Sequence, residues 1–241
     1  MPGLENNLEM WIGFMETINE VMGLLFGPDD ELRKIIWLTL RMSFFSTTIS
    51  AVLGIPLGVV LGCLKFPGRG ILMRVTTTLM GLPPVVAGLL VFLLLSRSGP
   101  LGSMKLLYTV TAMVIAQVII ITPIIAGLTA NVVGMRSKQI AETAHGIGLS
   151  AFKRLVLTFY ECRRHMISVL LSGFGRAISE VGAVQMAGGN IQHQTRVMTT
   201  TIMMVTNMGR FHVAIALGVV LLLIAFVVNG LAHFFQEKEN D

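Results

Sequence analysis

The sequence predicts an all-α polytopic membrane protein, and three observations lead to this fold class. The chain has 241 residues, of which 54% are hydrophobic and only 13% are charged, whereas ordinary soluble domains have about 25% charged residues. The charges are clustered, which leaves four long uncharged runs. Each run exceeds the roughly 20 residues that a helix needs to cross the hydrocarbon core. These runs are Met42–Leu64, Val75–Ser96, Leu106–Met135 and Phe211–Gln236.

The formal net charge of +5 raises the possibility of a nucleic-acid ligand. The basic residues, however, stand mostly beside the apolar runs, where they set the orientation of membrane helices. We therefore expect membrane lipid as a partner and no nucleic acid. The two cysteines, Cys63 and Cys162, have no CxxC or His–Cys spacing, so neither a disulfide framework nor a metal site is expected.

The first element in order is an N-terminal segment, residues 1–34. Apolar and acidic positions alternate at helical spacing over residues 8–26, which favours a short helix lying along the interface. Gly27–Asp30 then breaks the chain. The transmembrane domain follows and is expected to occupy residues 35–235, with a charged tail at 236–241.

Five spans are expected in this domain. The first runs from about Ile35 to Leu64, and the second from about Ile71 to Ser96. Pro83 and Pro84 stand in the middle of the second span, where they remove two amide donors and should kink the helix. The remaining spans are expected at about Leu107–Val133, His165–Ala187 and Phe211–Phe235, separated by polar segments at 136–164 and 188–210.

The distribution of basic residues predicts the orientation. The larger set should face the cytoplasm according to the positive-inside rule, which puts the N-terminus outside and the C-terminus inside the cell membrane. This set comprises Lys65, Arg69, Arg74, Arg136, Lys138, Lys153, Arg154, Arg163, Arg164 and Lys238. The opposite set comprises Arg33, Lys34, Arg97, Lys105, Arg196 and Arg210.

The cytoplasmic segment 136–152 has the pattern of a short helix followed by a glycine turn. Ile140, Ala144 and Ile147 recur at i, i+4 and i+7, which forms one apolar stripe. Gly148 lies in the turn, and Ser150 can N-cap the next helix. Such a helix either seats in the groove of a partner protein or is an ordinary amphipathic loop.

The fourth predicted span carries two charges and ends in glycines. Arg176 and Glu180 are one helical turn apart, so their side chains can meet and lower the cost of about 2.5–3.5 kcal/mol for a lone charge at this depth. The pair is either purely structural or lines a polar pathway. Gly182 permits close helix packing. The chain then breaks at Gly188-Gly189, and the residues after this break supply further polar groups. The pathway or gate candidates are therefore Pro83, Pro84, Gly189, Asn190, Thr195 and Arg196.

Arg196 is the full positive charge nearest to this break. It is expected to line the outward mouth of the pathway, or else to be an arginine that sets topology or contacts lipid headgroups. A cysteine at Ala183 is expected to crosslink to its copy in a second chain in at least one state of the transporter.

The cytoplasmic segment resembles a motif of a known family. Glu142-Thr143-Ala144, three residues and then Gly148 are similar to the E-A-A-x-x-x-G motif of ABC-importer permeases. The Ile-x-Leu-Pro ending common in that family is absent, because Leu155–Tyr160 contains no proline. The resemblance implies that Ile140, Glu142, Ala144, Ile147 and Gly148 form a coupling helix that docks on a cytoplasmic ATPase.

A second resemblance concerns the fourth span and the break. Ser179–Ala183, Gly189–Ile191 and Thr195-Arg196 are similar to the G-E-F-G-A … G-N-I … T-R/T pattern of molybdate, sulfate and tungstate permeases. The longer stretch from Gly173 to Thr200, together with Gly81–Val86 and Leu95–Gly102, looks closest to the tungstate type. This resemblance covers about residues 35–235.

The resemblance implies a molybdate-permease-like fold that works as a homodimer, because five spans are too few to enclose a pathway. It also implies an extracytoplasmic solute-binding protein that delivers a tetrahedral oxyanion, most specifically tungstate. The sequence contains no G-x-x-x-x-G-K-[S/T] phosphate-binding loop. The chain is therefore expected to be no enzyme and to hold no cofactor, with ATP and magnesium bound by a separate ATPase subunit.

Three alternatives remain open. The chain could be a molybdate or sulfate permease of the same type. It could be a self-contained secondary anion transporter, although no internal repeat is visible between the two halves. It could also be a membrane-embedded enzyme, but the candidate bases are scattered, and neither a catalytic set nor a metal-binding spacing emerges from them. These candidates are His145, His165, His193 and Glu180.

Overall fold

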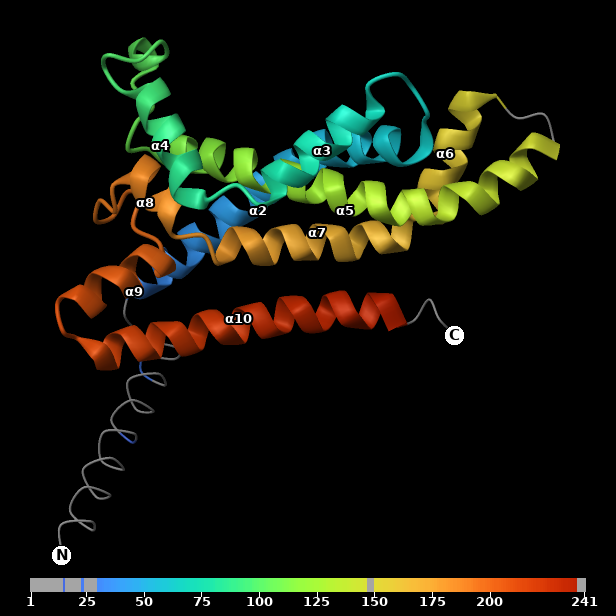
Figure 1. The fold of residues 1–241 in the computed structure, drawn as a ribbon. Coiled ribbons are helices and arrows are strands. Elements are labelled where there is room, and N and C mark those ends of the chain that lie inside the picture. Colours follow the sequence, from blue (N-terminus) through green and yellow to red (C-terminus); the bar gives the residue numbers. More distant parts are fainter. Residues whose placement is uncertain (1–14, 16–22, 24–29, 147–149, 238–241) are drawn as a thin grey trace, which may run out of the picture.

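The computed structural model describes residues 15, 23, 30–146 and 150–237, and this part of the chain is helical without any strand. Long helices lie side by side along one direction and shorter helices cover the ends (Figure 1). The helices are α2 Asp30–Cys63, α3 Arg69–Met80, α4 Pro84–Leu95, the 3₁₀ helix η1 Gly102–Met104, α5 Val110–Gly146, α6 Ala151–Glu161, α7 Arg163–Ile178, α8 Gly182–Gly188, α9 Met198–Asn207 and α10 Phe211–Glu237.

Within this described part, three helices are long and apolar enough to cross a membrane by themselves: Glu31–Cys63 in α2, Val110–Ser137 in α5 and Phe211–Leu231 in α10. Two further candidates are bent pairs, in which α3 and α4 meet at 98° and α7 and α8 meet at 59°. The predicted all-α membrane fold is therefore confirmed, with three to five spans. Of the N-terminal segment, mainly the first turn of α2 lies within the described residues.

The predicted kink at Pro83 and Pro84 is a complete break. A residue that precedes proline is pushed out of the α region, and Pro83 is extended with φ −60° and ψ 127°. Helix α3 therefore ends at Met80, and α4 starts afresh with Pro84 in its first turn. Single prolines have no such effect here, because Pro56 and Pro123 lie inside the uninterrupted helices α2 and α5.

The most extensive contact between two helices of the described part is that of α2 with α5. Three glycines spaced four residues apart, Gly54, Gly58 and Gly62, face α5 along this contact. A Cβ atom on Gly58 would stand 2.5 Å from the carbonyl oxygen of Ala126 and 2.5 Å from the Cβ of Thr129. The stripe thus allows two backbones to approach closely, as small residues commonly do between membrane helices.

The cytoplasmic segment differs from the expected separate short helix. Helix α5 continues without a break from Val110 to Gly146, so the third span and the segment that follows it are one rod. Gly134 lies inside the rod and does not interrupt it. The predicted cap of the next helix is confirmed, since the Ser150 side chain accepts from the Lys153 amide of α6.

The two ends of the bundle separate the described members of the two predicted sets of basic residues, and Lys238 lies outside the described residues. One end of the bundle contains the start of α3, the last turns of α5, helix α6 and the end of α10 (Figure 1). The end of α4, helices α8 and α9 and the start of α10 lie at the other. The loops that are predicted to face the cytoplasm and the loops that are predicted to face the outside thus lie at opposite ends of the bundle.

Candidate functional site

A buried amide connects three helices in the middle of the bundle. The side chain of Gln117 on α5 is fully buried. Its Oε1 accepts from the Ser46 hydroxyl of α2 at 2.7 Å, and its Nε2 donates to the Ala177 carbonyl oxygen of α7 at 2.8 Å. A buried amide without partners is costly in an apolar interior. These two bonds therefore fix α2 and α7 relative to α5 just before α7 ends.

The ion pair predicted from spacing is present where α7 ends. Arg176 Nη1 lies 2.7 Å from Glu180 Oε2, and the Glu180 side chain is only 3% exposed. The other carboxylate oxygen accepts from the Ala183 amide at 3.1 Å, so Glu180 also satisfies a free amide at the start of α8. The Glu180 carbonyl oxygen accepts from the Thr199 hydroxyl at 2.9 Å. One residue thus joins α7, α8 and α9.

After α8 the chain makes a compact turn. Gly189, Asn190 and His193 have positive φ angles of 70°, 52° and 62°, and glycine at the end of α8 takes this left-handed conformation without steric cost. The buried Thr195 closes the turn, because its hydroxyl donates to the Gly188 carbonyl oxygen at 2.6 Å and accepts from the Ile191 amide at 2.9 Å. The turn is therefore a fixed structure built from its own polar groups.

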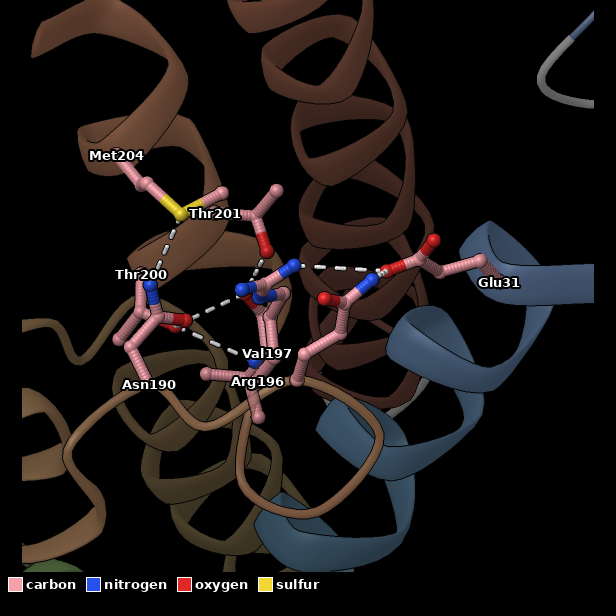
Figure 2. Close-up of polar contacts among 8 residues, drawn as sticks. Glu31, Asn190, Arg196, Val197, Thr200, Thr201 and Met204 are labelled. Atoms are coloured by element: carbon pink, nitrogen blue, oxygen red, sulfur yellow. Dashed lines mark hydrogen bonds and ion pairs between the residues drawn. The ribbon is translucent and has the colours of Figure 1, made fainter. Parts of the chain in front are cut away.

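The turn is hydrogen-bonded to helix α9. This helix was not among the elements expected from the sequence. Asn190 Oδ1 accepts from the Thr200 hydroxyl at 2.9 Å, and Asn190 Nδ2 lies 3.4 Å from the Met204 sulfur (Figure 2). The first turn of α9 is anchored to α2, where the Thr39 hydroxyl accepts from the Met198 amide at 3.0 Å. Asn190 and Thr195, both pathway candidates, are thus held in a hydrogen-bonded network.

Arg196 faces the first turn of α2. Its Nη1 lies 3.4 Å from Glu31 Oε1, and its side chain is 17% exposed (Figure 2). Both residues line a cleft of about 530 Å³ between α2, the turn, α9 and α10. The sequence gives no sign that Arg196 has an acidic neighbour, because Glu31 is 165 residues away in the chain.

The glycine and proline candidates lie where α4 meets α8. A Cβ on Gly182 would approach Val85 Cγ2 at 2.8 Å, and one on Gly88 would approach the Ala183 Cα at 2.7 Å. Pro83 and Pro84 begin α4 beside this contact. Ala183 is fully buried against α4 of its own chain. This conformation does not present Ala183 to a second copy, and the crosslink expected in at least one state of the dimer stays a prediction.

The predicted coupling residues lie at the far end of α5. Ile140, Glu142 and Ala144 are in its last turns, while Ile147 and Gly148 fall outside the described residues. The structure therefore brings the pathway candidates together around the α7–α8–α9 region and leaves the coupling residues at the opposite end of the bundle (Figure 1).

Several residues of this polar network were missed in the sequence analysis. Gln117 had a usable signal, because a lone strongly polar amide deep in an uncharged run generally faces a bundle interior. Thr39 had none, since threonines in apolar helices usually bond their own backbone, as Thr39 does with Ile35 at 2.7 Å. Thr199 and Thr200 are expected from the sequence as polar groups along the pathway, but their partners depend on which helices adjoin.

Comparison with known proteins finds a family whose sequence profile this chain matches. Residues 54–240 match the sequence profile of the family described as "Binding-protein-dependent transport system inner membrane component". The match covers α3 to α10 and the C-terminal end of α2 from Gly54 onward, including the Gly54–Gly62 stripe, the α3–α4 break and the network around Glu180.

Individual relatives agree with this match. The chain is 40% identical over 223 residues to a tungstate uptake system permease protein of Peptoclostridium acidaminophilum, covering 92% of this chain and 98% of the relative. It is 36% identical over 218 residues to the protein of the same name from Campylobacter jejuni, covering 90% and 91%. A sulfate transport system permease protein of Escherichia coli is more distant, at 25% identity over 239 residues, covering 94% and 81%. The chain therefore belongs to the family of inner-membrane components of binding-protein-dependent transport systems, the permease subunits of ABC transporters.

Proposed function

We propose that this chain is the membrane permease subunit of an ATP-driven importer for a tetrahedral oxyanion, and that the anion is tungstate. The observation that carries the proposal is the end-to-end similarity to a tungstate permease, which spans nearly the whole of both chains. The more distant similarity to a sulfate permease supports the broader class of tetrahedral dianions. Molybdate or sulfate is the alternative substrate within this class.

The interior chemistry is compatible with the passage of an anion. The described network around the α7–α8 break consists mainly of hydroxyl, amide and backbone groups, and its one buried carboxylate, Glu180, is paired with Arg176. Neutral donors bind an anion weakly enough to release it, which transport requires. An unpaired buried carboxylate would repel a dianion, so the Arg176–Glu180 pair removes an obstacle.

The energy for transport comes from a partner in this proposal. A separate cytoplasmic ATPase binds ATP and magnesium, and the segment 136–152 contacts it through Ile140, Glu142, Ala144, Ile147 and Gly148. The continuous helix α5 supports this role, because a rigid rod joins the segment to the bundle around Gln117. In this proposal, a displacement of the C-terminal end of α5 by the ATPase reaches the polar network through the helix itself.

Two copies of the chain enclose the pathway in this proposal, with the α3–α4 break near the two-fold axis. Gly81 is the appropriate position for a test, because it is exposed at the break and a Cβ there meets nothing closer than 3.5 Å. In a chain without Cys63 and Cys162, Gly81→Cys should form a crosslinked dimer in the resting or the ATP-bound complex. Absence of the crosslink in both states would count against this packing.

The delivery protein meets the end of the bundle that contains α8 and α9. The chain is accordingly a multi-pass protein of the cell membrane, with its N-terminus outside and its C-terminus in the cytoplasm. The basic residues near α6 support this orientation, because they lie at the end opposite to α8 and α9 and belong to the larger basic set.

The deciding experiment is uptake by the reconstituted permease, ATPase and binding protein in sealed vesicles. Tungstate, molybdate and sulfate are offered separately at equal low concentrations, with and without ATP. We expect ATP-dependent uptake that favours tungstate. Preference for molybdate or sulfate would reassign the substrate, and uptake by the permease without ATPase and ATP would instead indicate a secondary transporter.

A further inference from the structure

The cleft that contains Arg196 has the composition of an anion site. It lies between the first turn of α2, the turn after α8, and the facing sides of α9 and α10, with a volume of about 530 Å³. Two arginines, Arg196 and Arg210, and the amide of Gln192 line it together with Glu31. The remaining lining is mostly apolar, including Ile35, Met204 and Val213, so an ion inside would be partly shielded from water.

Arg196 is held in position by the turn and not only by its ion pair. Its backbone amide donates to the Ile191 carbonyl oxygen at 3.1 Å, next to Thr195, whose hydroxyl closes the turn. Its side chain is mostly buried at 17% exposure. The Nε atom is buried with no hydrogen-bond acceptor among the described residues. The guanidinium is therefore preorganised and has donor capacity to spare.

The carboxylate of Glu31 occupies the place that an oxyanion would take. Its Oε1 atom accepts from Gln192 Nε2 at 2.9 Å and also lies 3.4 Å from Arg196 Nη1. One oxygen thus receives a neutral and a charged donor from the same turn, which is how proteins commonly hold an oxygen of sulfate or a similar anion. Figure 2 shows Glu31 reaching across from α2 toward the guanidinium of Arg196.

The contact is suited to exchange. Glu31 is 40% exposed and the distance to the guanidinium is 3.4 Å, whereas tight charge-assisted bonds measure about 2.7–2.9 Å. A long ion-pair contact with one partly exposed partner contributes little net stability. An incoming anion can therefore displace the Glu31 carboxylate from the guanidinium, and it also has to replace the 2.9 Å bond from Gln192.

We propose that this cleft is an access site for a tetrahedral oxyanion, and that the Glu31 carboxylate is an internal substitute that the anion displaces from Gln192 and Arg196. The inference rests on the proposed function and extends it by naming the competing residue. Arg210 supplies further positive potential to the cleft. Competition from Glu31 keeps the binding weak, which allows the anion to leave the cleft again.

The test measures anion binding directly, without ATP and without the binding protein. The permease–ATPase complex in lipid nanodiscs is titrated with labelled tungstate, molybdate and sulfate, and binding is followed by equilibrium dialysis. Glu31→Gln removes the competing charge while retaining side-chain size, and it should tighten binding by at least about fivefold. Arg196→Gln should abolish measurable binding, and the double variant should behave like Arg196→Gln. Glu161→Gln is the matched control, because it removes one acidic charge from an exposed position on α6 at the other end of the bundle.

The outcomes separate this inference from the proposed function. Tighter binding of any of the three anions by Glu31→Gln supports the cleft even if uptake assays reassign the substrate. Equal binding by wild type, Glu31→Gln and Arg196→Gln overturns it, even when ATP-driven tungstate uptake is normal. If no variant binds an anion while Glu31→Gln and Arg196→Gln change association with the binding protein, the cleft receives a protein side chain and the inference is wrong.

Discussion

The carboxylate of Glu180 lies 2.7 Å from the guanidinium of Arg176, one helical turn earlier, where α7 ends and the chain bends by 59° into α8. Because the second carboxylate oxygen of Glu180 accepts from the Ala183 amide, the pair neutralises a buried charge and also fixes the bend. Arg176 remains 32% exposed, so this charge is in partial contact with the surroundings of the bundle.

Replacing Glu180 with alanine should destabilise the permease. The change leaves Arg176 without its partner and the start of α8 without an acceptor, which together should cost about 2 kcal/mol. For a chain of this size that corresponds to a decrease of roughly 4–8 °C in the unfolding midpoint of the purified complex. Glu180→Gln should cost less, because its amide oxygen can still accept from Ala183. Equal midpoints for wild type and Glu180→Ala would show that the pair has no structural importance.

Replacing Gln117 with leucine should loosen the contact among α2, α5 and α7. The substitution removes the bonds to Ser46 and Ala177, and such interhelical bonds in membranes are worth about 0.6–2 kcal/mol. Asn131→Leu on the same helix is the control, because Asn131 is exposed. Thermal unfolding in detergent should show a lower midpoint for the first variant only. A similar effect of both variants would mean that loss of an amide, and not loss of the bridge, is responsible.

Substituting alanine at Gly58 should disturb the packing of α2 against α5. The new methyl group would stand 2.5 Å from the Ala126 carbonyl oxygen and from the Thr129 Cβ, so α2 and α5 would have to separate. We expect a cost of about 1–3 kcal/mol, seen as reduced yield of folded protein and a lower unfolding midpoint. Gly218→Ala, where a Cβ meets nothing within 4 Å, should behave like wild type; a comparable loss there would refute the packing explanation.

A charge at Gly148 should interrupt communication with the ATPase. On the proposed coupling role, Gly148→Asp should abolish substrate-stimulated ATP hydrolysis and uptake while the permease still inserts in the membrane. Gly70→Asp provides the comparison, because Gly70 lies in the first turn of α3 and is exposed, with no atom within 4 Å of its Cβ position. Stimulated hydrolysis and uptake retained in full by Gly148→Asp would remove this segment from the coupling mechanism.

The orientation can be checked with an impermeant maleimide on intact cells. In a chain without Cys63 and Cys162, Ser98→Cys should be labelled from outside, because the exposed Ser98 lies in the loop after α4. Lys153→Cys on α6, also exposed, should be labelled only after the membrane is opened. The reverse pattern would invert the proposed topology.

The sequence by itself determined the class of the fold and much of its local structure. Composition and run length require membrane helices, because apolar stretches of this length are stable only in lipid or in a large core. Local rules also placed the Ser150 cap, the position of the α3–α4 break and the meeting of Arg176 with Glu180, since each depends on residues within a few positions of each other. The resemblance carried by Glu142–Gly148 and Ser179–Thr200 led to the correct family.

Only the tertiary structure decided the contacts between distant segments. The Ser46–Gln117–Ala177 bridge, the Thr39–Met198 anchor and the pairing of Arg196 with Glu31 each join residues at least 60 positions apart. A hydroxyl or amide in an apolar helix satisfies its hydrogen bonds with whichever neighbour is within about 3 Å, and that neighbour depends on how the helices are arranged. The burial of Ala183 and the packing role of the Gly54–Gly62 stripe also depend on the arrangement of the helices. A small residue allows close packing only where a second backbone lies against it.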